Sequence, residues 1–371
     1  LSSRNPLLLA LFIFFCTLQV TAQRKPSSDS DFNAIATKAA AARDADRLDE
    51  ALSLYKKAVG LNPRWAEGWF YLGTLHYDRN NYAPAATAFR RVIALQPNSG
   101  TALVMLGLCE FQLGQDSEAL KHLEKGKEIG VSNDPELRQT VLFDEALLLQ
   151  RKGSFESAKE PLDQLCRDKV DRKEVVLTLG LVQLRLRATD PGAKLNSAPK
   201  VVEMIGQAGC LAAQKRYDEA RPAFAQIVKN FPDFPNVHYA FGNFLADIPD
   251  ITAAREQYEL EIKNNPADVL SRLKIAALLY RTDSAAGIPF AREAIKIDPK
   301  VPLAHYLLGL LLLDTDDYKG AIPELEIAKK GLPAEPKLYF ALGTAYSRAG
   351  RNAEAAQARA QFQRLQKKQT D

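Results

Sequence analysis

The stretch from Trp69 to Pro97, WFYLGTLHYDRNNYAPAATAFRRVIALQP, decides the fold of this chain. Its apolar residues return at helical spacing in two runs, and the polar turn RNN separates these runs. Gly73 and Ala85 are small enough to let two helices approach closely, and the aromatic ring of Phe89 fills the remaining space. Proline ends a helix because it has no amide N–H and clashes with the preceding turn. The stretch therefore predicts two antiparallel helices packed against each other.

The same pattern recurs along the chain with a period of 34 residues. Three pairs of prolines have this spacing: Pro63 with Pro97, Pro232 with Pro266, and Pro299 with Pro333. Glycines equivalent to Gly73 stand at Gly107, Gly242, Gly309 and Gly343. One helix pair cannot bury its apolar face alone, so neighbouring pairs must stack into a continuous core.

These residues resemble the tetratricopeptide repeat (TPR) family. The matching positions are Trp69, Leu72, Gly73, Ala85, Phe89 and Pro97, then Gly107, Ala119, Ala220, Phe224, Pro232, Gly242, Ala254, Tyr258, Pro266, Gly309, Ala321, Pro333, Gly343, Tyr346 and Ala355. The match runs from about Phe32 over nearly all of the remaining chain. The resemblance implies an all-α fold, a right-handed superhelical solenoid of antiparallel helix pairs.

The repeats predict two blocks, an N-terminal block over residues 32–187 and a C-terminal block over residues 201–371 that ends in a capping helix. The predicted units are 32–65, 66–99, 100–133, 139–172, 201–234, 235–268, 269–301, 302–335 and 336–369. Residues 173–187 predict a first helix with Gly180 in the repeat position, but no second helix follows. Residues 188–200, rich in turn formers, predict an insertion that is either a passive joint, the favoured interpretation, or a functional loop.

The N-terminus predicts export. Arg4 is followed by the uncharged block LLLALFIFFC over residues 7–16, which is too short to span a bilayer comfortably. Residues 1–22 therefore predict a signal peptide cleaved after Ala22, and residues 23–31 (QRKPSSDSD) predict a flexible linker. The alternatives are an uncleaved anchor and a lipid anchor at Cys16, which the bulky Phe15 disfavours. We expect a periplasmic or secreted protein of a bacterial cell.

Three cysteines follow the signal: Cys109, Cys166 and Cys210. They form no CxxC motif and have no histidine cluster nearby, which argues against a zinc site and a disulfide framework. A bridge between Cys166 and Cys210 is an alternative in an oxidising compartment. The favoured interpretation is that all three are small buried apolar side chains within helices.

No motif in the sequence predicts catalysis, a cofactor or a metal. The chain has four histidines, of which His238 and His305 occupy positions of large core side chains. No phosphate-binding glycine loop, HExxH or GxSxG motif occurs. The 49 basic and 45 acidic residues are interleaved, which argues against a nucleic-acid partner. An enzyme with a site near residues 188–199 remains the less favoured alternative.

The resemblance implies that the first helix of each pair lines a concave groove. Helical spacing predicts which side chains face it. They are Phe70, Tyr77, Phe111, Phe143, Tyr239, Asn243, Tyr280, Tyr306 and Phe340. Apart from Asn243, the Lys and Asn residues with which some family members bind a terminal carboxylate are missing from these positions. The groove is predicted to be apolar and aromatic, which suits peptides with apolar anchors.

These features together predict a scaffold or adaptor that binds other proteins or peptides in the cell envelope. A carrier of a glycan or lipid in the groove is the alternative, and a small-molecule ligand is not favoured. Contact with a membrane is expected only through the N-terminal segment if that segment is uncleaved.

Overall fold

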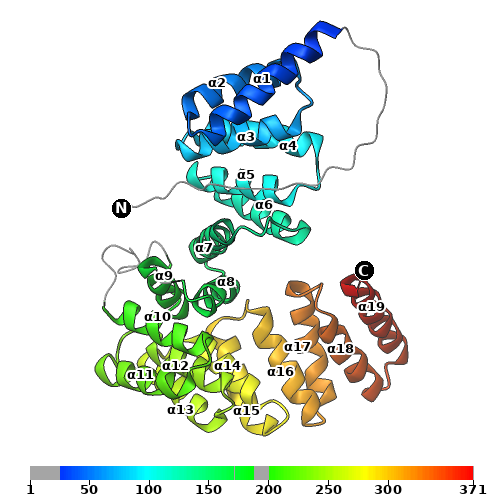
Figure 1. Cartoon of the computed structure of the whole chain (residues 1–371). Coiled ribbons are helices and arrows are strands. Elements are labelled where there is room, and N and C mark those ends of the chain that lie inside the picture. The colour runs from blue at the N-terminus through cyan, green and yellow to red at the C-terminus, as the bar shows by residue number, and fades with distance from the viewer. Residues whose placement is uncertain (1–25, 171, 188–199, 371) are drawn as a thin grey trace. The chain divides into compact units, whose positions relative to one another are not determined.

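The computed structural model describes residues 26–170, 172–187 and 200–370 (Figure 1). These residues form α-helices and no β-strand. The helices are α1 (Pro26–Asp44), α2 (Leu48–Leu61), α3 (Ala66–Asp78), α4 (Tyr82–Leu95), α5 (Gly100–Gln112), α6 (Asp116–Ile129), α7 (Pro135–Lys152), α8 (Phe155–Arg167), α9 (Lys173–Gln183), α10 (Lys200–Ala213), α11 (Tyr217–Asn230), α12 (Val237–Asp247), α13 (Ile251–Asn264), α14 (Val269–Leu279), α15 (Ser284–Ile297), α16 (Pro302–Asp314), α17 (Tyr318–Gly331), α18 (Pro336–Arg348) and α19 (Asn352–Thr370).

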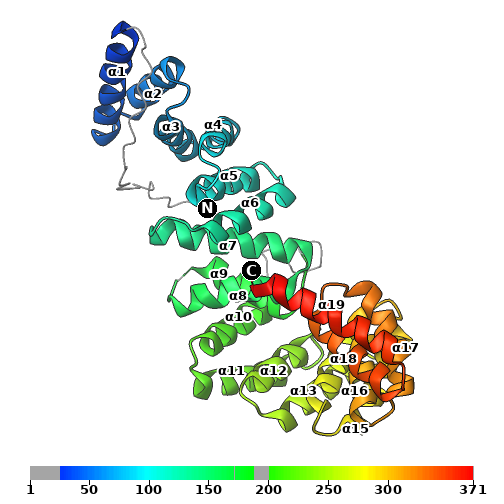
Figure 2. The same cartoon turned by 90° about the vertical axis from the view of Figure 1, so that its right-hand side faces the viewer.

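Each repeat unit in the sequence holds two consecutive helices joined by a short turn (Figures 1 and 2). The pairs run from α1 with α2 to α7 with α8, and then from α10 with α11 to α18 with α19. Helix α9 stands between these two series, where the sequence predicts a first helix without a second. The predicted all-α array of stacked helix pairs is confirmed.

Small residues set the packing distance within a pair. A Cβ atom built on Gly73 of α3 would lie 2.8 Å from the ring of Phe89 on α4. Phe89 and Ala85 are fully buried at this contact. A methyl group at residue 73 would therefore force the two helices apart, which is why the repeat carries glycine there.

The described residues divide into two compact units. Residues up to Thr178, together with Arg187, belong to the N-terminal unit, and Leu179–Leu186 with the residues from Lys200 onward belong to the C-terminal unit. The boundary falls inside α9, whereas the sequence places the end of the first block at residue 187. The C-terminal half of α9 packs closely on α10, where a Cβ atom on Gly180 would lie 1.9 Å from the carbonyl oxygen of Val202.

Helix α1 begins at Pro26, inside the segment predicted as a flexible linker over residues 23–31. The prediction is wrong from Pro26 onward. Proline is favourable at a helix start, because the first amide groups have no partner within the helix. The predicted signal peptide and the insertion at residues 188–199 lie outside the described residues. Within the described parts, no helix is both long and apolar enough to cross a bilayer.

The cysteines differ from the favoured sequence interpretation. Cys166 and Cys210 are each disulfide-bonded, and Cys109 is a buried free thiol. Burial raises the pKa of the Cys109 thiol to about 12, which keeps it protonated and unreactive. The interpretation of all three as reduced core side chains therefore holds only for Cys109. Helical periodicity could not separate these cases, because it shows burial and not which sulfur atoms meet.

A carboxylate from a neighbouring helix caps the N-terminus of α12. Glu261 of α13 is 2% exposed and accepts hydrogen bonds from the backbone N–H groups of Asn236 (2.9 Å) and Tyr239 (3.3 Å). The Asn236 side chain does not cap the helix, because its amide donates to the carbonyl oxygen of Leu184 at 2.9 Å. Glu261 thus satisfies two amide groups that would otherwise be buried without partners.

Replacing Glu261 with alanine should lower the free energy of unfolding by about 1–2 kcal/mol, the cost of losing a helix cap. Chemical denaturation followed by circular dichroism measures the effect. Glu256→Ala on the exposed side of the same helix is the control, with an expected change below about 0.5 kcal/mol. Equal effects of the two substitutions would contradict the capping role.

Candidate binding face of the first helices

The first helices of successive pairs contact one another within each unit. In the N-terminal unit α5 contacts α7, and in the C-terminal unit α10 contacts α12, α14 contacts α16, and α16 contacts α18. We call the surface that these first helices form on each unit, with α3 included in the N-terminal unit, the first-helix face of that unit. The residues predicted to line a groove belong to these helices, except Tyr280, which directly follows α14, and they differ in exposure.

In the N-terminal unit the predicted aromatic side chains are half-buried. They are Phe70 and Tyr77 on α3, Phe111 on α5 and Phe143 on α7. The Phe70 ring packs edge-on against Phe89, with centroids 5.7 Å apart, and Tyr77 packs edge-on against Tyr82 at 5.6 Å. Two of these rings are therefore fixed by contacts to the second helix of their own pair and still expose part of their surface.

In the C-terminal unit the predicted residues differ in exposure. Phe340 is 60% exposed and packs against Phe362 of α19 at 5.6 Å, while Asn243, Tyr280 and Tyr306 are half-buried. Tyr239 is only 1% exposed. Its prediction as a binding residue is wrong, because its ring lies in the core against Tyr258, 5.9 Å away.

Two of the half-buried residues are tied to their neighbours. Asn243 accepts a hydrogen bond from the hydroxyl of Tyr258 at 2.9 Å. Burial, together with Glu335 and Tyr280, raises the pKa of Tyr306 to about 12. Tyr306 therefore stays neutral and able to donate a hydrogen bond over the physiological pH range.

Arginine side chains lie close to two of these rings. The sequence analysis did not predict these arginines. The guanidinium of Arg151 lies 5.0 Å from the ring centroid of Phe111, and that of Arg172 lies 5.8 Å from Phe143. Arginine near an aromatic ring is a favourable pair. Arg151 shares the helical face of Phe143 by spacing along α7, so periodicity could have indicated it. Arg172 precedes α9, and no sequence pattern connects it to Phe143.

Buried acids in the N-terminal unit generally pair with a cation. Glu110 contacts Arg90 at 2.9 Å and His122 at 2.6 Å. Glu145 contacts the ammonium group of Lys127 at 2.5 Å. These pairs offset the cost of burying a carboxylate.

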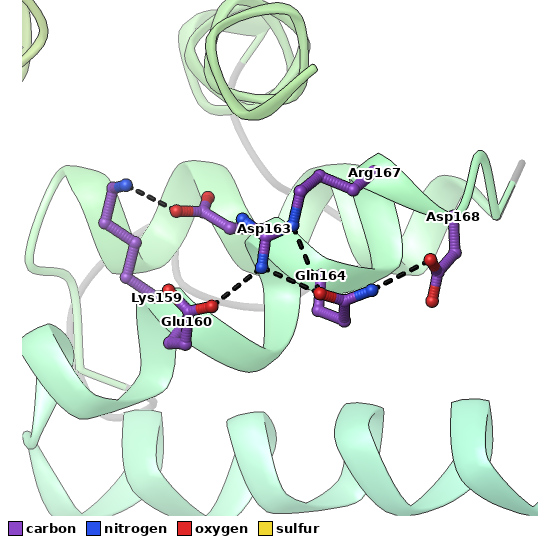
Figure 3. A network of polar contacts seen from close by, with 6 residues as sticks. All are labelled: Lys159, Glu160, Asp163, Gln164, Arg167 and Asp168. Atoms are coloured by element: carbon purple, nitrogen blue, oxygen red, sulfur yellow. Dashed lines mark hydrogen bonds and ion pairs between the residues drawn. The ribbon is translucent and has the colours of Figure 1, made fainter. Parts of the chain in front are cut away.

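Helix α8 carries the same arrangement within a larger polar network. Figure 3 shows Asp163, which is buried, paired with Lys159 at 2.5 Å. Farther along the helix Arg167 bridges Glu160 and Gln164, and Gln164 in turn donates to Asp168. Burial raises the pKa of Asp163, although the neighbouring Lys159 opposes the shift.

Asp144 on α7 is the exception among these buried acids. Its side chain is 6% exposed, and it makes no hydrogen bond within the described part of the chain. Burial raises the pKa of Asp144 to about 7, while the positive charges of Arg151 and Arg172 act in the opposite direction. The carboxyl group is thus divided between its neutral and ionised forms near pH 7.

Two of the four histidines lie in the core, where the sequence analysis placed them. His238 and His305 are buried, and Nδ1 of His305 lies 2.6 Å from Glu324 while its Nε2 lies 3.0 Å from the carbonyl oxygen of Pro299. Burial, with Arg79 and Lys56, lowers the pKa of His76. Across the described residues, no group of three His, Cys, Asp or Glu side chains is placed to hold a metal ion.

The tetratricopeptide repeat family matches residues 37–99, 72–130, 210–269 and 274–336, together more than half of the chain. The chain therefore belongs to this family of helix-pair repeat proteins. Its members serve broadly as scaffolds for protein–protein interaction, and this coarse function follows from the family.

Comparisons with individual proteins show distant similarity. Human protein O-mannosyl-transferase TMTC3 is 22% identical over 252 residues, which cover 63% of this chain and 26% of that protein. The chain thus spans about a quarter of the length of this relative. Among solved structures, MamA from Desulfovibrio magneticus RS-1 has a TM-score of 0.43 at 19% identity, covering 47% of this chain and 99% of its own. Yeast Tom70 has a TM-score of 0.38 at 14% identity, covering 91% and 85%.

Proposed function

We propose that the chain is an adaptor that binds partner proteins or peptides on the first-helix face, through apolar anchors that pack on its half-exposed aromatic rings. The observation that carries the proposal is the exposure of these rings. Phe340 is 60% exposed, and Phe70, Tyr77, Phe111 and Phe143 are half-buried although each is large and apolar. Rigid aromatic surface of this kind is typical of binding sites.

We propose further that the adaptor works in the periplasm or outside a bacterial cell. The apolar N-terminal segment and the small residues up to Ala22 support export. The disulfide bonds at Cys166 and Cys210 support it independently, because disulfides persist in oxidising compartments and are rare in reducing ones.

Binding without catalysis is part of the same proposal. Family membership supports it, since the repeat supplies a scaffold and a surface. The name of human TMTC3 describes a transferase, but this chain spans only 26% of that protein, so the activity does not carry over.

Replacing Phe70, Tyr77 and Phe111 together with alanine should abolish capture of partners from envelope fractions. The change removes three anchoring rings and the apolar area they offer. Affinity capture with quantitative mass spectrometry compares the variant with the parent chain, and circular dichroism shows that both are folded.

The matched control is the double variant Leu61→Ala, Leu95→Ala. Both leucines are exposed, at 48% and 37%, but they lie at the ends of second helices. This control should keep its partners. Unchanged partners in a folded triple variant would refute binding on the first-helix face. Where the triple variant unfolds, Phe340→Ser tests the same idea, because its exposed ring contributes little to the core.

A further inference from the structure

The last repeat of the C-terminal unit, α18 with α19, concentrates positive charge. Residues 335–368 contain seven lysines and arginines and two acidic residues, a net charge of +5, whereas the whole chain has a net charge of +4. Both acids are engaged within the repeat. Glu354 pairs with Arg351 at 2.9 Å, and Glu335 accepts a hydrogen bond from the backbone N–H of Lys337 at 3.0 Å. The repeat therefore carries an excess of positive charge that its own acids do not balance.

Two of these cations lie at the ends of a stripe along α18. Lys337, Phe340, Thr344 and Arg348 follow one another at intervals of three or four residues, so they share one face of the helix. Lys337 and Arg348 are exposed, and within the described residues neither makes an ion pair. The ring of Phe340 between them is 60% exposed. We call these four residues the α18 stripe.

The neighbouring first helix adds apolar surface beside the α18 stripe. Helix α16 contacts α18, and the 34-residue period makes Leu303 and Tyr306 of α16 the equivalents of Lys337 and Phe340. Leu303 is 45% exposed, and Tyr306 is half-buried. The first-helix face of the C-terminal unit thus combines exposed apolar side chains with unpaired cations.

The charges around the α18 stripe favour an acidic partner. On α16 the position equivalent to Arg348 is occupied by Asp314, whose carboxylate already accepts a hydrogen bond from the hydroxyl of Ser284 at 2.7 Å. Ammonium and guanidinium groups form charge-assisted hydrogen bonds with carboxylates. A lysine or arginine of a partner would instead meet the excess positive charge of the repeat.

We propose that the α18 stripe binds a short acidic segment of a partner protein, in which an aromatic residue packs on Phe340 and acidic residues on either side pair with Lys337 and Arg348. The proposal rests on the proposed function and names the chemistry of the partner on the C-terminal unit. The exposed ring supplies the apolar anchor, and the two cations select the charge of the segment.

The length of the α18 stripe sets the spacing within the segment. Lys337 and Arg348 are separated by about 16 Å along the helix axis, which an extended chain of about five residues spans. Phe340 lies one turn from Lys337 and about two turns from Arg348. The aromatic residue of the segment should therefore adjoin one acidic residue and lie about four residues from the other.

The test uses the full chain and fluorescent peptides that are blocked at both ends. The acidic peptide is acetyl-Glu-Glu-Phe-Ser-Ser-Glu-Glu-amide, and the neutral peptide has glutamine in place of every glutamate. Fluorescence anisotropy gives the dissociation constants at low and high salt. At low salt we expect the acidic peptide to bind about tenfold more tightly than the neutral peptide, because each of two exposed ion pairs contributes about threefold. Screening should reduce this preference to about twofold or less at about 0.5 M salt.

Variants separate the charges from the ring. The double variant Lys337→Gln, Arg348→Gln should weaken binding of the acidic peptide about tenfold and leave the neutral peptide unaffected. Phe340→Ala should weaken both peptides alike, by about tenfold, because it removes apolar area that either peptide covers. All three side chains project from the folded unit into solvent, and circular dichroism checks that the variants are folded.

The matched control is the double variant Lys319→Gln, Lys330→Gln on α17. These two lysines are exposed and have the same separation along the sequence as Lys337 and Arg348, but they belong to a second helix. The control therefore removes the same charge from the same unit without touching the α18 stripe. It should change the affinity for either peptide by less than about twofold.

Three results would overturn the proposal. They are equal affinity for the acidic and neutral peptides at low salt, a preference for the acidic peptide that survives Lys337→Gln, Arg348→Gln, and displacement of the acidic peptide by a competitor that binds more tightly than the peptide itself. The competitors are single-stranded oligothymidylate and vesicles of phosphatidylcholine with phosphatidylglycerol, which would assign the surface to a nucleic acid or to a membrane.

Failure of this proposal can be distinguished from failure of the proposed function. Equal binding of both peptides that depends on Phe340 refutes the acidic partner and leaves binding on the first-helix face standing. If neither peptide binds, the acidic partner is rejected, while the capture experiment on Phe70, Tyr77 and Phe111 of the N-terminal unit decides the proposed function separately.

Discussion

Replacing Gly180 with alanine should lower the free energy of unfolding by about 3 kcal/mol or more, the upper range for overpacking a core. The added methyl carbon would lie 1.9 Å from the backbone oxygen of Val202. A backbone carbonyl of a helix cannot rotate away as a flexible side chain can. Helices α9 and α10 must therefore separate, and the contacts around the buried Leu179 and Val202 are lost with them.

Gly60→Ala is the matched control for this substitution. A Cβ atom on Gly60, in helix α2, would have no atom within 4 Å apart from its chain neighbours and the nearby backbone of its own helix. This change should raise stability by about 0.5–1 kcal/mol, because alanine loses less backbone entropy than glycine in a helix. Urea denaturation followed by circular dichroism measures both variants. A Gly180→Ala variant as stable as the parent would contradict the close packing of α9 on α10.

Replacing Asp144 with asparagine should stabilise the chain at pH 8 by about 4 kcal/mol and have little effect at pH 4. Burial raises the pKa of Asp144 to about 7 in the folded chain, against about 3.9 when unfolded. Between these values the folded state binds more protons than the unfolded state, so the stability of the parent falls as pH rises from about 4 to about 7. Asparagine carries no charge, so the stability of the variant does not fall with pH for this reason.

Thermal unfolding at several pH values between 4 and 8 provides the measurement. The difference in melting temperature between Asp144→Asn and the parent should grow with pH and level off above about pH 7 to 8. Asp168→Asn serves as the control, because that carboxyl directly follows the end of α8 and is exposed. A constant difference across the pH range would show that Asp144 does not titrate as described.

The repeat architecture could be predicted from the sequence, because the residues that set the packing of a helix pair recur at the same positions in successive repeats. Gly73, Ala85 and Phe89 identify a close helix pair, and their recurrence identifies the array. Even α9 could be foreseen, since Gly180 stands in the repeat position without a following second helix. The start of α1 could not, because residues 26–31 carry no apolar periodicity and the helix forms there through its continuation into later residues.

The candidate site could be predicted only in part. Helical spacing places Phe70, Tyr77, Phe111 and Phe143 on one surface, but it does not give the depth of a side chain. Tyr239 therefore looked equivalent to Phe340, although one is buried and the other exposed. Arg172 lies near the ring of Phe143 only through tertiary packing, because α8 and a turn separate them along the chain.

The edge-on packing of Phe70 against Phe89 and of Tyr77 against Tyr82 has a consequence for the thermodynamics of association. Side chains that already occupy one rotamer have little conformational entropy left to lose when a ligand arrives. The ordering cost then falls mainly on the ligand. Peptides stiffened by cyclisation should therefore gain affinity mainly through slower dissociation, while the rate of association stays close to that of their linear forms.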